Sequence, residues 1–158
     1  MAYNWWVFLH IVGVLGFFAT HGASMVVLFR VRKERDRARL EELISFSGTT
    51  VRPMYVSLGV LVVGGVAAGI VGSWFSYWWI WAAIGILVVM TGLMTAVARP
   101  WFSQISEACG MRPTGVPRKS DEELDEILRG PRFHVINLTG TLGLLLIVYL
   151  MIFKPGVG

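Results

Sequence analysis

Three histidines are the only side chains in the apolar part of this chain that titrate near neutral pH. His10 and His21 lie in the stretch FLHIVGVLGFFATHG, and His134 begins the last apolar segment. In a helix, the step of eleven residues from His10 to His21 makes about three turns, so both side chains share one face about 16 Å apart. Gly13 and Phe17 lie close to the same stripe. An ionisable residue inside a membrane segment is a candidate functional residue by default.

Imidazole is the usual axial ligand of haem iron, and in a helix bundle such ligands come from facing helices. His10, His21 and His134 are therefore candidate ligands of haem b, and His10 and His21 are also candidate metal ligands. Met90, expected at the depth of His21, is a candidate axial sulfur, and copper bound through His and Met is a second option. The structural alternatives are a hydrogen bond across helices to a Ser, Thr or Asn137 side chain, and a methionine that only fills space.

Composition and charge define the class of protein. Hydrophobic residues make up 55% of the chain, the mean hydropathy is +0.64, and no charged residue lies between Pro53 and Ala98. Four apolar segments stand out in the sequence, and each is long enough to cross a bilayer. In lipid, the backbone polar groups of such a segment must bond to one another, which only a helix allows. We therefore predict an all-α integral membrane four-helix bundle, formed by one domain over residues 1–158, with spans at about 5–29, 54–72, 77–98 and 133–153.

The basic residues predict the orientation. All of them except Lys154 lie in the connections 30–53 and 99–132. By the positive-inside rule both connections are cytoplasmic and both termini lie outside. This charge is explained by topology and by contact with anionic lipid head groups, so no nucleic-acid partner is expected. We expect a multi-pass protein of the bacterial inner (cytoplasmic) membrane, with Tyr55 and Trp101 in the aromatic belt at the inner interface.

The first connection is rich in good helix formers. We expect the first helix to continue beyond the membrane over residues 30–46, with Leu40 on an apolar edge. The sequence SGTT at 47–50 should end that helix, and Pro53 suits the first turn of the next one.

The second connection, residues 99–132, should contain one short helix. Residues 111–117 should be irregular, and residues 120–130 should be helical, because Ser120 and Glu123 form a capping box and Gly130 follows the last turn. Cys109 is the only cysteine, which excludes an intrachain disulfide, and we expect it to be inert.

Small residues indicate how the helices pack. The second segment contains GGVAAGIVG, in which Gly65 and Gly69 are four residues apart, and small residues at this spacing let helices approach closely in lipid. The third segment repeats the pattern with Gly85, Gly92 and Ala96, and the fourth with its two glycines at 140 and 143. A flat porphyrin or quinone ring lying against these glycines is the alternative.

Two stretches resemble the four-span protoporphyrinogen oxidase family of the HemJ type. They are the opening MAYNWWVFLHIVGVLGFF and the ending LLLIVYLMIFKPG. The resemblance implies haem b binding and a role for His10. The family carries a lysine in its third helix, whereas the corresponding WWIWAAIGIL at 78–87 has none.

The whole chain also resembles an uncharacterised bacterial family of small four-span proteins near the copper-resistance D-type proteins. The similar parts are LHIVG, the arginine-rich first connection, ARPWF and LMIFKPG. This resemblance implies the fold and a membrane location.

Three functions remain open from the sequence. The first is an accessory or assembly subunit of a membrane complex, with the bilayer and other membrane subunits or a second copy as partners. The second is a b-type haem redox protein, and the third is a copper or small-solute transport component. We find no phosphate loop, dinucleotide fingerprint, zinc-protease helix or nucleophile elbow, so the sequence leaves open whether the protein is an enzyme.

Overall fold

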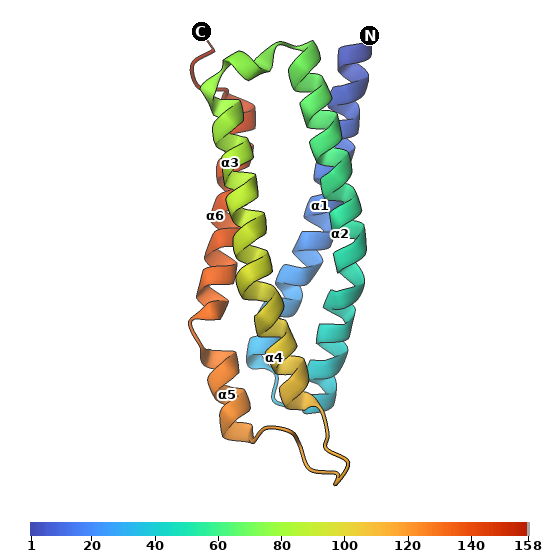
Figure 1. Ribbon diagram of the computed structural model, residues 1–158, viewed down its shortest axis with the longest axis vertical. Coiled ribbons are helices and arrows are strands. Elements are labelled where there is room, and N and C mark those ends of the chain that lie inside the picture. Colours follow the sequence, from blue (N-terminus) through green and yellow to red (C-terminus); the bar gives the residue numbers. More distant parts are fainter. Residues whose placement is uncertain (158) are drawn as a thin grey trace.

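The computed structural model describes residues 1–157, which form an all-α four-helix bundle (Figure 1). Four helical stretches are long and apolar enough to cross a membrane, and each contains one predicted span, so the chain is a multi-pass membrane protein. The elements are α1 (Ala2–Lys33), α2 (Arg37–Val71), η1 (Trp74–Ser76), α3 (Trp78–Leu93), η2 (Met94–Ala98), α4 (Arg99–Cys109), α5 (Asp121–Arg129) and α6 (Arg132–Phe153).

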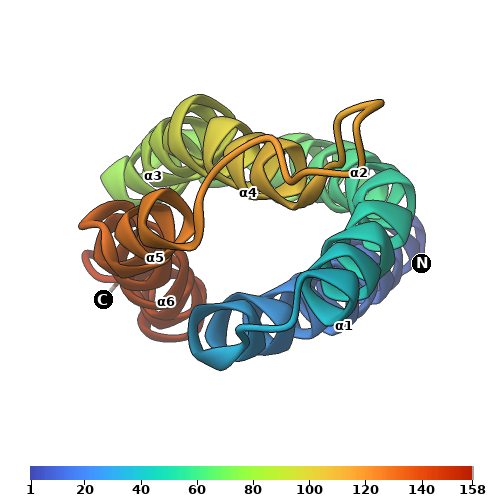
Figure 2. The same cartoon turned by 90° about the horizontal axis from the view of Figure 1, so that it is seen from below.

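The helices are arranged as two antiparallel pairs. α1 packs along α2, and α3 packs along α6. Both termini lie at one end of the bundle, and α4, α5 and the turn between α1 and α2 lie at the other end, which we call the basic end (Figure 1). Viewed along the bundle from the basic end, the helices follow one another around a ring (Figure 2).

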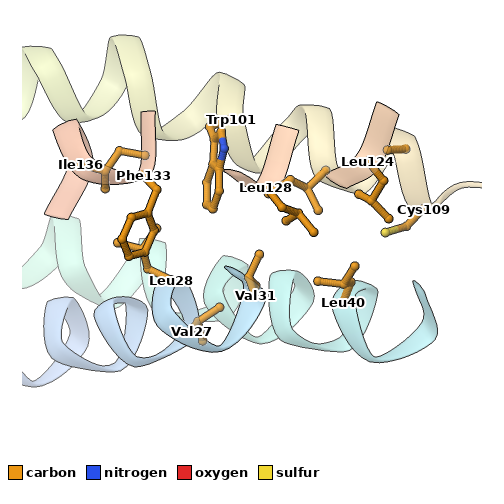
Figure 3. Close-up of a cluster of buried hydrophobic side chains, with 12 residues drawn as sticks. Val27, Leu28, Val31, Leu40, Trp101, Cys109, Leu124, Leu128, Phe133 and Ile136 are labelled. Carbon is orange, nitrogen blue, oxygen red and sulfur yellow. The ribbon is translucent and has the colours of Figure 1, made fainter. Parts of the chain in front are cut away.

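The largest buried cluster joins both pairs at the basic end (Figure 3). Trp101 is fully buried at its centre, and its indole N–H donates to the carbonyl oxygen of Ile127 at 3.0 Å. The prediction that Trp101 belongs to an interfacial belt was wrong, because α5 folds over it and supplies the partner for its N–H. The cluster contains Val27, Leu28, Val31, Leu40, Trp101, Ile105, Ala108, Cys109, Leu124, Leu128, Phe133 and Ile136.

The first connection differs from the prediction. α1 ends at Lys33 and α2 begins at Arg37, so the chain reverses at residues 34–36 and not at 47–50. Asp36 is the N-cap of α2, and its carboxylate accepts the N–H groups of Ala38 and Arg39. This local capping outweighs the helix propensity of the neighbouring charged residues.

α2 runs without interruption through SGTT, so Pro53 lies inside the helix and not in its first turn. The hydroxyls of Thr49 and Thr50 donate to the carbonyl oxygens of Phe46 and Ser47, at 2.7 Å each. Threonine hydroxyls within a helix often bond a carbonyl oxygen three or four residues earlier in this way.

The second connection agrees with the sequence. α5 has Ser120 as its N-cap, and the capping box with Glu123 is complete in both directions. Leu124 and Leu128 are buried against the rest of the basic end.

Glycines bring α1 and α2 into backbone contact, as the small residues of the second segment predicted. A Cβ added at Gly13 would lie 2.4 Å from the backbone nitrogen of Leu61, and one added at Gly64 would lie 2.6 Å from that of His10. No side chain fits at either position without moving a helix.

The glycines of α3 behave differently. A Cβ added at Gly85 or Gly92 would meet nothing within 4 Å, and Ala96 is exposed. The prediction that this face packs inside the bundle was therefore wrong. α3 contacts α6 with the face that carries Trp79 and Met90, which leaves the small residues uncovered.

Candidate functional site

His10 contacts α2. Its ring lies against Gly65, where an added Cβ would be 2.7 Å from Nδ1, and Nδ1 lies 2.8 Å from the carbonyl oxygen of Leu61. A carbonyl oxygen can only accept, so Nδ1 carries the proton and donates it. The other ring nitrogen, Nε2, is left as the acceptor and possible ligand atom.

His21 contacts α6 and η2. Its ring stacks on Phe17, with the ring centroids 5.6 Å apart and the planes at 7°. Nε2 is buried and has no hydrogen-bond partner within residues 1–157. A Cβ added at Gly140 of α6 would lie 3.2 Å from this nitrogen and 3.3 Å from Cε of Met94. The helix face shared by His10 and His21 therefore meets α2 near the start of α1 and α6 further along.

Met94 begins a π-helical turn. In η2 the backbone N–H of Arg99 donates to the carbonyl oxygen of Met94, five residues earlier. Pro100 follows at once, and it has no N–H to bond the carbonyl of Ala96, so the wider turn accommodates the proline. Single π turns inside α-helices frequently occur at functional sites.

The sequence predicts Met90 as the sulfur near His21. Met90 is buried, but its side chain packs over Gly143, where an added Cβ would lie 2.1 Å from Sδ. Met94, which is not among the residues predicted from the sequence, lies beside His21. One signal in the sequence could have identified Met94. It lies four residues after Met90, and this spacing places both side chains on one helix face.

His134 lies at the basic end near the start of α6 and is exposed. The guanidinium of Arg32 donates to its Nε2 at 3.4 Å, and the same guanidinium covers the ring of Phe133 at 4.2 Å. His134 therefore contacts Arg32 at the basic end and contacts neither His10 nor His21.

The three histidines are thus not brought together. His10 and His21 remain about three helical turns apart along α1, and the described residues contain no group of three or more His, Cys, Asp or Glu side chains that could hold a metal ion.

An open groove of about 550 Å³ separates α2 from α3. Its polar groups are the hydroxyls of Thr91 and Thr95, which donate to the carbonyl oxygens of Leu87 and Thr91 in their own helix. The remaining lining is apolar. The groove is formed by Leu58, Val62, Leu87, Val88, Thr91, Gly92, Thr95 and Ala96.

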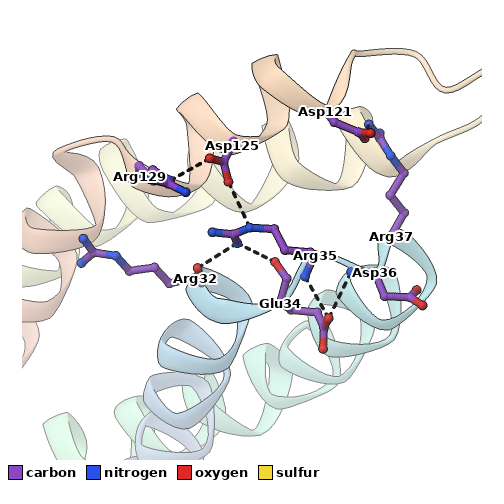
Figure 4. A network of polar contacts seen from close by, with 8 residues as sticks. All are labelled: Arg32, Glu34, Arg35, Asp36, Arg37, Asp121, Asp125 and Arg129. Atoms are coloured by element: carbon purple, nitrogen blue, oxygen red, sulfur yellow. Dashed lines mark hydrogen bonds and ion pairs between the residues drawn. The ribbon is translucent and has the colours of Figure 1, made fainter.

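Ion pairs connect the elements of the basic end (Figure 4). The carboxylate of Asp125 lies 3.1 Å from the guanidinium of Arg35 and 2.7 Å from that of Arg129. Cys109 is buried in the apolar cluster of this end. These contacts describe a closed structural end, so the groove and the histidines are the candidate functional regions.

The fold and these regions define a four-span helical membrane protein with an open groove and two partly buried histidines. Comparisons with protein-family models, with curated proteins and with solved structures gave no match. The resemblances in the sequence therefore stay predictions.

Proposed function

We propose that this protein is an accessory or assembly subunit of a membrane complex that holds an apolar transmembrane helix of another subunit in the groove between α2 and α3. The observation that carries the proposal is the uncovered small-residue face of α3 beside this groove. Gly92 lines it, and no atom lies within 4 Å of a Cβ added there.

The surface suits a helix because small residues permit the close backbone approach on which helix association in lipid depends. The chain uses the same device where its own helices touch, at Gly13 and Gly64. The groove offers no free hydroxyl donor to a polar ligand, since Thr91 and Thr95 donate to their own helix. Val88, which is 65% exposed, adds apolar contact area on the same wall.

Site-specific photo-crosslinking in membranes tests this function. A photoreactive residue replaces Val88, and the captured protein is identified by mass spectrometry with and without Gly92→Leu. Gly92→Leu fills the groove without touching the chain's own packing. Gly22→Leu is the matched control, because Gly22 is equally uncovered but lies on α1. We expect a crosslink to a partner that has its own transmembrane helix. Gly92→Leu should abolish this crosslink, and Gly22→Leu should retain it.

Other outcomes contradict the proposal. Crosslinks confined to a second copy of this chain would make the groove a self-association surface. Crosslinks that Gly92→Leu and Gly22→Leu leave equally strong would show that the partner does not occupy the groove.

The second candidate function is a haem b redox protein, and His10 is the observation that favours it. Histidines that bind a metal usually donate their other ring N–H to a carbonyl or carboxylate, which fixes the ligand nitrogen. His10 has this arrangement through Leu61, so its Nε2 would be the atom that holds the iron of a bound haem. His21 lies too far along α1 to be the second ligand of the same haem.

An oxidised-minus-reduced absorption spectrum of the purified protein tests the haem hypothesis. A Soret band that decreases in His10→Ala and persists in His134→Ala supports it. A flat spectrum from folded protein prepared with haem supplied would reject it.

A further inference from the structure

The point where α1 meets α6 contains a nitrogen atom that nothing in the fold explains. Nε2 of His21 is buried without a hydrogen-bond partner among residues 1–157. A buried polar atom left unpaired is costly, so such an atom in a folded protein needs a reason. We propose that His21, Met94 and Met90 form a binding site for a soft monovalent metal ion, Cu(I).

Two methionine side chains approach the same face of α6 as this nitrogen. Nε2 of His21 and Cε of Met94 lie on the same small patch of α6, because a Cβ added at Gly140 would be 3.2 Å from the first and 3.3 Å from the second. Sδ of Met90 lies over Gly143, one helical turn along the same helix. The glycines leave space on α6 that these side chains occupy from α1 on one side and from α3 and η2 on the other.

The donor set selects the ion. Thioether sulfur and imidazole nitrogen are ligands of Cu(I), whereas magnesium and calcium require oxygen ligands. No carboxylate lies in the apolar segments, so every ligand here is neutral. A divalent ion would bring two uncompensated charges into this apolar region, and a monovalent ion brings only one.

The π turn gives the site its freedom to adjust. Met94 is the first residue of η2, where the helix is locally widened. A methionine side chain has three rotatable bonds and is partly buried here without a fixed polar contact. Met94 can therefore turn its sulfur toward Nε2 of His21 while the helix backbone stays in place.

The test is a Cu(I) titration of the full-length protein in detergent, under a reductant, against a coloured Cu(I) chelator. We expect one Cu(I) per chain. Met94→Leu and Met90→Leu should each raise the Kd at least tenfold, and His21→Leu should abolish binding. Leucine keeps the size and apolar character of methionine, so the methionine variants fold. Met151→Leu, in the cluster at the other end, is the matched control and should bind as tightly as the parent.

A second variant removes the space and keeps the donors. Gly140→Ala places a methyl group between His21 and Met94, and it should weaken binding as strongly as Met94→Leu. X-ray absorption of the bound copper should show both nitrogen and sulfur ligands. The proposal is overturned if folded parent protein binds no Cu(I), if Met94→Leu and Met90→Leu together leave the Kd unchanged, or if copper has no sulfur ligand. None of these readouts involves the groove, so this site and the proposed subunit function fail independently.

Discussion

The guanidinium of Arg37, the first residue of α2, lies 2.6 Å from the carboxylate of Asp121, the first residue of α5 (Figure 4). The same guanidinium donates to the carbonyl oxygen of Lys119 at 3.0 Å and to that of Ala108. One side chain therefore joins the start of α2, the end of α4 and the loop before α5.

Arg37→Ala should lower the free energy of unfolding by about 1–3 kcal/mol, because two carbonyl oxygens lose a charged donor in a largely buried position. The Arg37 side chain is only 15% exposed, whereas Asp121 is 89% exposed. Asp121→Asn should therefore cost less, about 1 kcal/mol or below. Unfolding of both variants in mixed micelles measures the difference. Equal losses would show that the ion pair, and not the bonds to the carbonyl groups, holds this end.

Gly13→Ala should destabilise the contact between α1 and α2. The added methyl would lie 2.4 Å from the backbone of Leu61, which moves only if the helices separate. Overpacking of this kind costs about 1–3 kcal/mol. Gly22→Ala on the same helix meets nothing within 4 Å and should be neutral or stabilising by up to about 1 kcal/mol. The same unfolding assay compares them, and equal effects would contradict the close approach of the helices.

Glu34 should make the turn between α1 and α2 sensitive to acid. Its carboxylate accepts the N–H groups of Asp36 and Arg35, and these bonds lower the pKa of Glu34 below its ordinary value of 4.5. A lowered pKa means that the stabilisation is present above the ordinary value and is lost as the pH falls through the folded value. The parent should therefore be more stable than Glu34→Gln near neutral pH, and the gap should close in acid.

The control for this pH dependence is Glu126→Gln on α5, where no hydrogen bond to the carboxylate is found within the described residues. Melting temperatures of the parent and both variants, taken over a pH series, give the comparison. A gap for Glu34→Gln that is constant with pH would show that the charge of this carboxylate does not stabilise the turn.

Single cysteines should report the orientation of the chain. In a Cys109→Ala background, Ala2→Cys should react with a membrane-impermeant maleimide on intact cells. Thr114→Cys should react only after permeabilisation. Both positions are exposed, and the positive-inside rule places the basic connections in the cytoplasm. The reverse labelling pattern would invert the proposed topology.

The sequence by itself determined the number of membrane helices and the cap of α5. Both depend on local physics: the length of an apolar run needed to cross a bilayer, and a Ser120 side chain that reaches a backbone N–H three residues away. The apolar face of α5 was readable for the same reason, since Leu124 and Leu128 repeat at the helical period.

The sequence misplaced the reversal between the first two helices. The charged segment has high helix propensity and SGTT has low propensity, so propensity alone favoured a break at 47–50. Asp36 decided otherwise by capping α2. The Thr50 hydroxyl, which also contacts Ser24 at 2.8 Å, helped keep the later segment helical within the α1–α2 pair.

The neighbours of each chemical group were decided only by the tertiary structure. The sequence places His10 and His21 on one face, but the crossing of α1 from α2 toward α6 gives one a carbonyl partner and leaves the other beside Met94. Gly92 is uncovered and Gly64 is packed against His10, although both are small residues in apolar helices. Such contacts join segments far apart in the chain, and in lipid they depend on the shapes of the paired surfaces, which no local pattern encodes.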